Sequence, residues 1–285
     1  MKKAQQTTRK EISARGQALH SGKNVEMNLI PQPVDTGIIF SRSDLPGKPV
    51  IQAKPENVID TVKSISLGNS KWRIQTIEHL MAALHGLSVD NLLVEVNGEE
   101  LPLGDGSAWF FAELILKAGL VPQEAPRRVI KVTKPIWVED RKEPRSYLLA
   151  LPGEGLRVSY CFTSDHQATG DQFCQYLITP ETFQQELAKA RTIAFEKELA
   201  FLREQGLALG GTVEEAVVVG EDGYLNELRY PNEIVRHKVL DILGDLYLLG
   251  PIEGQIIGVR SGHKMDYELT MEIKRALEGG NNCGD

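Results

Sequence analysis

Cysteine and long apolar runs are both scarce in this sequence, and each scarcity excludes a class of protein. The three cysteines, Cys161, Cys174 and Cys283, have no C-x-x-C spacing, which argues against a disulfide scaffold and a cysteine zinc site. No run of 18 apolar residues occurs, and residues 1–3 lead into a polar stretch, so neither a membrane-spanning helix nor a secretory signal is expected. We therefore expect a protein of a reducing compartment, the cytoplasm.

A surplus of basic residues is also missing. Lysine and arginine number 32 against 39 acidic residues, which gives a formal net charge of −7. Nucleic acid and anionic membranes are therefore not expected partners. The length of 285 residues is sufficient for two modest domains, each with its own core.

Patterns typical of strands and helices follow one another twice along the chain, which predicts an α+β fold. The first half has predicted strands at 26–31, 37–41 and 92–96 and helices at 76–87 and 108–118. The second half has predicted strands at 129–132, 147–152, 156–162, 216–219 and 255–259 and helices at 180–190, 196–205 and 236–249. Residues 29–39 and 149–157 share a strand, proline, glycine-turn, strand plan. We interpret the chain as two duplicated domains packed face to face.

The predicted boundary between the two domains lies near residue 125. Residues 119–128 contain two prolines among charged residues, a composition typical of a linker. We therefore expect an N-terminal domain at 1–125 and a C-terminal domain at 126–278. The tail at 279–285, rich in glycine and asparagine, is expected to be disordered.

The chemistry of the chain centres on residues 236–246, where His237, Asp241 and Asp245 recur every four residues. In a helix these side chains share one face, while the apolar residues lie mainly on the other. An imidazole and a carboxylate in such apolar surroundings need partners, and a divalent metal suits both. The alternative is the polar stripe of an ordinary surface helix.

A catalytic zinc takes three protein ligands and keeps one position open. His79 is the best third candidate, because the neighbouring Glu78 could take a proton from the attacking water. His85 competes for this role, although its place near the end of a predicted helix explains it adequately. His263 follows a strand and a glycine, a loop position that suits either a catalytic acid or a solvated histidine.

Seven short patches carry a resemblance to a known family. They lie at residues 18–22, 76–80, 105–107, 190–192, 206–211, 235–246 and 261–263. In their order and spacing, from about residue 9 to 277, they resemble the UDP-3-O-acyl-N-acetylglucosamine deacetylases, the zinc enzymes of lipid A synthesis. The resemblance implies two α+β domains of like topology, with their helices sandwiched between the two sheets.

The same resemblance assigns roles to the polar residues. His79, His237 and Asp241 match the zinc ligands, and Glu78 matches the general base. Further matches are Thr192, which helps to hold the oxyanion, His263, which protonates the leaving amine, and Asp245, which orients His263.

The resemblance also implies a substrate site. Lys238 matches a lysine close to the reaction centre, and Arg260 stands where the family often has a lysine near the diphosphate. His20 and Asp105 fall at positions linked to activity or site structure. An apolar passage for the acyl chain comes from the second domain. The residues assigned to substrate binding are Lys238, Arg260, Ile193, Phe195, Gly211, Glu215 and Leu19.

The sequence departs from the family pattern at two places along this passage. Ile193 stands where the family commonly has phenylalanine, and Glu214 and Glu215 follow residues 210–212 where lining residues are usually neutral. The acyl-chain length therefore stays open.

Two other functions also stay open. One is a zinc amidase acting on another N-acetylated sugar or amine, and the other is a non-catalytic protein that binds a nucleotide sugar. Two histidines and a carboxylate suit Fe2+ as well as Zn2+. The expected partner is a UDP-linked acylated amino sugar, and the expected oligomeric state is a monomer.

Overall fold

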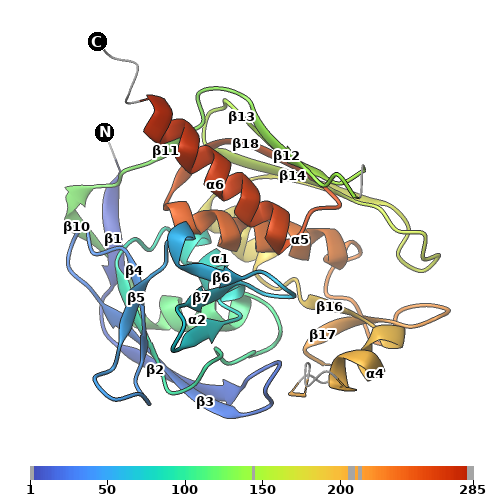
Figure 1. Cartoon of the computed structure of the whole chain (residues 1–285), viewed down its shortest axis with the longest axis horizontal. Coiled ribbons are helices and arrows are strands. Elements are labelled where there is room, and N and C mark those ends of the chain that lie inside the picture. Colours follow the sequence, from blue (N-terminus) through green and yellow to red (C-terminus); the bar gives the residue numbers. More distant parts are fainter. Residues whose placement is uncertain (1–2, 143–144, 205–208, 211–213, 281–285) are drawn as a thin grey trace.

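Two β-sheets form the outer layers of the molecule, and helices fill the space between them (Figure 1). The computed structural model describes residues 3–142, 145–204, 209–210 and 214–280. No helix within these ranges is both long enough and apolar enough to cross a bilayer.

The two sheets have the same topology. The first contains, in spatial order, β2 (Ile12–Gln17), β3 (Asn24–Pro31), β9 (Leu92–Val96), β4 (Ile38–Arg42) and β5 (Val50–Gln52). The second contains β12 (Ile136–Glu139), β13 (Tyr147–Leu151), β18 (Ile252–Val259), β14 (Leu156–Phe162) and β15 (Gln172–Leu177). In each sheet the strand that comes last in the chain lies at the centre. Strand β9 runs antiparallel to β3 and parallel to β4, and β18 runs antiparallel to β13 and parallel to β14. The predicted α+β duplication is therefore confirmed.

The helices repeat in the same way. Helix α1 (Glu78–Gly86) precedes β9 and α2 (Trp109–Ala118) follows it, as α5 (Glu233–Leu246) precedes β18 and α6 (His263–Gly280) follows it. Every residue of α1 is buried, and so is every residue of α5 except Arg236 and Lys238. Helices buried on all sides belong to a core, and α1 packs directly on α5 (Figure 1). This sheet, helix, helix, sheet arrangement is the predicted sandwich.

Each half carries an insertion just before its central helix. In the first half, β6 (Val58–Asp60), β7 (Ser66–Gly68) and β8 (Arg73–Gln75) precede α1. In the second half, β16 (Thr192–Phe195), α4 (Glu196–Glu204) and β17 (Ala216–Val219) precede α5, and Figure 1 shows them beside the sandwich at lower right. The short turns are η1 (Pro55–Asn57), α3 (Pro180–Thr182), η2 (Phe183–Leu187) and η3 (Tyr247–Leu249). The insertions thus lead into the helices whose residues could hold a metal.

The predicted linker is wrong, because residues 119–128 contain the strand β10 (Leu120–Pro126). This strand pairs with β1 (Ala4–Thr8), which lies in the part of the chain that we expected to be only a polar start. The two form a separate two-stranded sheet. Proline is tolerated there because one side of an edge strand pairs with no other strand, so a missing N–H on that side costs no hydrogen bond. The second sheet begins after this ribbon with β11 (Ile130–Lys131), which pairs with β18.

The C-terminal helix α6 was not predicted. His263, expected in a loop, is its first residue, and Met265, Leu269 and Ile273 form its buried stripe at four-residue spacing. The helix includes Gly279 and Gly280, so the predicted tail begins too early; glycine is common at helix ends. Residues 281–285 and Cys283 lie outside the described residues. Cys161 and Cys174 are free thiols.

The α1–α5 crossing depends on one glycine. A β-carbon added to Gly244 would lie 2.1 Å from the carbonyl oxygen of Glu78, far inside the contact distance of two heavy atoms. Only a residue without a side chain lets the two helices approach this closely. Gly244 therefore sets the distance between the two halves of the molecule at the metal-ligand candidates.

Gly244→Ala is expected to lower the free energy of unfolding by about 1–3 kcal/mol, because the clash is with backbone and the helices must separate. Urea unfolding measures the change. The matched control is Gly223→Ala, where an added β-carbon meets nothing within 4 Å. Equal stability of the two variants would show that the crossing tolerates a methyl group.

Candidate metal centre

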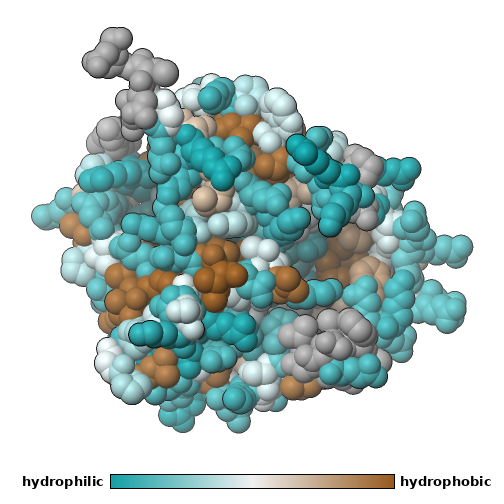
Figure 2. Space-filling view, in the orientation of Figure 1, coloured by the Kyte–Doolittle hydropathy of each residue, from teal (hydrophilic) through white to brown (hydrophobic). Residues whose placement is uncertain are grey.

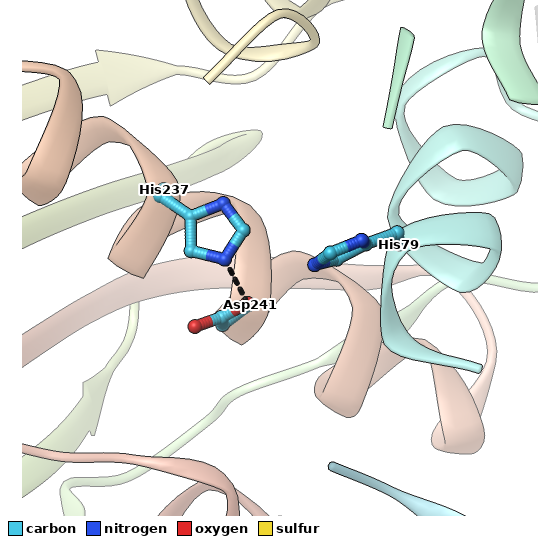
Figure 3. Close-up of side chains that lie close together, drawn as sticks. All are labelled: His79, His237 and Asp241. Atoms are coloured by element: carbon cyan, nitrogen blue, oxygen red, sulfur yellow. Dashed lines mark ion pairs between the residues drawn. The ribbon is translucent and has the colours of Figure 1, made fainter. Parts of the chain in front are cut away.

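Two histidines and an aspartate from the two halves of the molecule converge between α1 and α5. His79 lies in the first turn of α1, and its ring meets that of His237 edge to face with the centroids 5.0 Å apart. His237 and Asp241 lie one turn apart on α5, with Nε2 3.2 Å from Oδ1. One donor atom of each residue lies within 4.8 Å of the others, and Figure 3 shows a ring nitrogen of His79 pointing toward the other two side chains. The predicted ligands are therefore brought together.

The hydrogen bonds of His237 show what this cluster lacks. Its Nδ1 lies 3.0 Å from the carbonyl oxygen of Ala190, which can only accept, so Nδ1 carries the proton and Nε2 presents a lone pair. Oδ1 of Asp241, 3.2 Å from that Nε2, is buried and meets no hydrogen-bond donor among the described residues. Two electron-rich atoms at this distance repel each other unless a cation lies beside both. The donor set and the fixed tautomer therefore fit a divalent metal.

The electrostatics of the ligands agree with this interpretation. Burial lowers the pKa of His79 to about 3, so its imidazole is neutral and able to bind a metal. Burial opposes ionisation of Asp241, but the adjacent ammonium group of Lys238 favours the carboxylate, and the pKa of Asp241 lies well below its usual range. Nζ of Lys238 also donates to Oδ2 of Asp241 at 2.8 Å.

Glu78 is buried immediately before His79. Its Oε2 accepts a hydrogen bond from the backbone N–H of Ile65 at 3.0 Å, which fixes the carboxyl group at the start of α1. Burial raises the pKa of Glu78 to about 7, and the nearby charges of His263 and Asp245 act on it in opposite directions. A carboxyl group with such a pKa can both take up and release a proton near neutrality.

His263 and Asp245 form a hydrogen-bonded pair. Nδ1 of His263 lies 2.8 Å from Oδ2 of Asp245, whose side chain has no exposed surface. The N–H at Nδ1 donates to the carboxylate, which holds the imidazole in one orientation. Nε2 is then the ring nitrogen that faces away from Asp245. The structure thus brings together the two residues that the resemblance pairs.

A buried ion pair fixes the segment that faces His237. Arg191 donates from its backbone N–H and from Nε to Oε1 of Glu233, both at 2.9 Å, and the two side chains are 6% and 0% exposed. This pair ties the chain between Ala190, whose carbonyl holds His237, and Thr192 to the first turn of α5. Neither Arg191 nor Glu233 received a predicted role, and their separation of 42 residues explains why local pattern did not reveal it.

The two predicted substrate cations line one pocket. Lys238 and Arg260 lie on a cavity of about 270 Å³ together with Tyr160, Phe162 and Thr163. Nη1 of Arg260 donates to the hydroxyl of Thr163 at 3.0 Å. Because Lys238 also contacts Asp241, this cavity adjoins the metal ligands.

The predicted passage residues lie in and around the second insertion. Ile193 and Phe195 are on β16 and pack against Val217, Val219 and Ile234 in a small apolar cluster separate from the main core. Leu19 belongs to the first half of the chain and contacts this insertion. Its carbonyl oxygen accepts a hydrogen bond from the N–H of Gly210 at 2.9 Å. Glu214 is exposed and Glu215 is half-buried, while Gly211 lies outside the described residues.

Three further residues singled out in the sequence have mainly structural contacts. Nδ1 of His85 donates to the carbonyl of Leu243 at 2.8 Å, so this histidine joins α1 to α5 and lies outside the ligand cluster. Asp105 pairs with Arg229 at 2.6 Å. The backbone N–H of His20 donates to a carboxylate oxygen of Glu100 at 2.8 Å. The sequence did not predict this hydrogen bond.

Comparison with known proteins identifies the family. Residues 5–275 match the family described as LpxC: UDP-3-O-acyl N-acetylglycosamine deacetylase. The UDP-3-O-acyl-N-acetylglucosamine deacetylase of Acidithiobacillus ferrooxidans is 44% identical over 277 residues, 96% of this chain and 89% of that protein. The proteins of the same name from Pseudomonas entomophila and Oleidesulfovibrio alaskensis are 41% and 40% identical, over 94% and 96% of this chain and 89% and 90% of their own lengths. This chain therefore belongs to the UDP-3-O-acyl N-acetylglycosamine deacetylase family.

Proposed function

We propose that this chain hydrolyses the acetamide of UDP-3-O-acyl-N-acetylglucosamine, which gives the free amine and acetate in lipid A biosynthesis. Family membership supports the reaction. The observation that carries it is the buried cluster of His79, His237 and Asp241, with Glu78 next to it in sequence and His263 near it. A protein that only binds a nucleotide sugar needs neither a base nor an acid beside a metal site.

We assign the metal to His79, His237 and Asp241, with Zn2+ as the ion and Fe2+ as the alternative that the same ligands accept. When bound, such an ion supplies a Lewis acid and lowers the pKa of water. The protein contributes neutral imidazoles, an ionised carboxylate and the carbonyl of Ala190, which keeps Nε2 of His237 free.

Proton transfers fall to Glu78 and His263. The carboxylate of Glu78 takes a proton from the attacking water. The amine would otherwise leave as an amide anion, which is too basic to be expelled near neutrality, so Nε2 of His263 donates a proton to the departing nitrogen. Asp245 stabilises the protonated imidazole through Nδ1, and the hydroxyl of Thr192 donates to the developing oxyanion.

Lys238 and Arg260 are assigned to the charged groups of the substrate, the diphosphate in the case of Arg260. Arg260→Ala is expected to raise KM about tenfold or more, the effect of losing one hydrogen bond to a charged group, with kcat within about twofold, because the pocket binds a part of the substrate that does not react. Steady-state kinetics test this. Lys264→Ala is the matched control, since Lys264 is 70% exposed on α6 and pairs with Glu268. A fall in kcat at unchanged KM would contradict the assignment.

Acetate release separates this function from its rivals. The purified protein, loaded with zinc, is offered a UDP-linked 3-O-acylated N-acetylglucosamine and, separately, N-acetylglucosamine and other simple N-acetyl amines. We expect release from the nucleotide-linked substrate alone. Comparable release from simple amines would favour a general zinc amidase, and binding without any release would favour a non-catalytic protein.

We further propose that the acyl chain lies along Ile193 and Phe195, with Leu19 and the backbone at Glu215 completing the passage. Isoleucine is shorter than the phenylalanine typical of the family, so a substrate series of varied acyl length tests whether this chain accepts a different length. The cytoplasmic location and the monomeric state remain predictions, the first supported by family membership.

A further inference from the structure

One buried carboxyl group next to the catalytic pair has no role in the proposed reaction. Asp266 lies in the first turn of α6, three residues after His263, and is 1% exposed. An acidic residue at this position of a helix normally faces solvent and interacts with the helix dipole. Here the side chain turns inward. One of its carboxylate oxygens lies within 4.8 Å of a carboxylate oxygen of Asp245 and of a ring nitrogen of His263.

The oxygens of this cluster are not all satisfied. Oδ2 of Asp245 accepts from His263 at 2.8 Å. Oδ1 of Asp245 and Oδ1 of Asp266 are buried and meet no N–H or hydroxyl donor among the described residues. One carboxyl oxygen of Asp245 and one of Asp266 lie within 4.8 Å of each other. Two buried carboxyl groups this close repel each other if both are ionised, so one of them carries a proton.

We propose that Asp266 is a positioning residue that carries this proton and donates it to Asp245, so that Asp245 in turn holds His263 in place. The inference rests on the proposed function for its kinetic consequence, but the proton on Asp266 does not depend on that function. Asp266 touches no reacting atom in this scheme, and its proton stays between the two carboxyl groups throughout the reaction.

The surrounding charges decide which carboxyl group keeps the proton. Burial, followed by the charge of Asp245, raises the pKa of Asp266 to about 8, with Asp241 acting in the same direction and His263 and Lys238 against it. Glu78 from α1 acts on the same cluster, and the hydroxyl of Tyr160 on β14 donates to the carbonyl of Ser261 at its edge. Burial, followed by the charge of Asp241, also raises the pKa of Asp245 well above its usual range, so the two carboxyl groups do not both ionise. The hydrogen bond that Asp245 accepts from Nδ1 of His263 stabilises its carboxylate, which makes Asp245 the anion and Asp266 the acid.

Two substitutions separate this role from a merely structural one. Asp266→Asn keeps a donor toward Asp245 but cannot ionise, so we expect kcat within about twofold of wild type near pH 7. Asp266→Ala leaves Asp245 without that donor, and kcat is expected to fall about tenfold, the lower end of the usual loss of an outer hydrogen-bond partner, with KM unchanged. Glu268→Gln, a change at a half-exposed residue of the same helix, is the control and should alter neither kcat nor KM.

A titration that needs no substrate tests the proton directly. In protein with 15N-labelled histidine, the His263 resonances, assigned with His263→Gln, should show a second inflection near pH 8 from Asp266 in wild type and none in Asp266→Asn. Identical titrations of wild type and Asp266→Asn would overturn the proposal, as would full kcat in Asp266→Ala, or a second equivalent of bound metal that is lost in Asp266→Asn. If wild type releases no acetate but the inflection is present, the proposed function fails and the protonation of Asp266 stands.

Discussion

Glu78→Ala is expected to lower kcat by about 10²- to 10⁴-fold, the usual contribution of a general base, and to leave the metal content unchanged. Glu78 is not one of the three converging ligands, yet it is buried beside His79, and its pKa of about 7 suits proton transfer near neutrality. Metal analysis and an acetate-release assay on the same preparation measure both quantities. A fully active Glu78→Ala protein would contradict the proposed mechanism.

Two further variants make this test specific. Glu78→Gln keeps an oxygen that can accept from the N–H of Ile65, so the first turn of α1 should stay intact while the base is lost. His79→Ala removes a ligand and should lose both metal and turnover. Loss of metal in Glu78→Gln would move Glu78 into the ligand set.

Glu233→Ala is expected to lower the free energy of unfolding by about 3–5 kcal/mol, because it leaves the guanidinium of Arg191 buried and without its partner. Glu233 also accepts from the N–H of Arg229 at 2.6 Å, so the substitution removes several charge-assisted hydrogen bonds from the first turn of α5. Urea unfolding measures the loss.

The effect of Glu233→Ala should extend to the metal site. The released segment carries Ala190, whose carbonyl fixes the tautomer of His237, so a weaker metal affinity is expected in the folded variant. The matched control is Glu113→Ala, which breaks an exposed pair with Lys117, 50% and 61% exposed, and should cost less than about 1 kcal/mol. A loss as small as that of the control would show that water reaches Arg191 and replaces its partner.

The sequence predicted most of the fold because helical and strand periodicities are local. The four-residue spacing of polar residues on α5 and the apolar pattern of α1 located the two central helices. Strand β10 was missed because its prolines mimic a linker and its partner β1 lies more than 100 residues away in sequence. Helix α6 was missed because only a thin apolar stripe marks its buried side, and the glycine before His263 drew attention to a loop.

Of the candidate site, the sequence predicted the metal ligands but not the residues that support them. Histidine and carboxylate spacing on one helix indicates a metal, the neighbouring Glu78 made His79 the best third ligand, and the resemblance decided the role of His263. The supporting residues could not be found in this way: Glu233, Glu100 and Asp266 are ordinary acidic residues in the sequence, and only burial and the hydrogen bonds of the folded chain set them apart. On the face shown in Figure 2, hydrophilic residues cover much of the surface between smaller hydrophobic patches, so the composition does not reveal which few acidic residues are buried.

The central claim is that α1 and α5 jointly bind one divalent ion, and anomalous diffraction from crystals grown with zinc tests it most directly. We predict one strong peak at the zinc edge, bonded to His79, His237 and Asp241 at about 2.0–2.2 Å, which disappears in His79→Ala. A peak bound elsewhere, or rings of His79 and His237 that share no ion, would contradict the account.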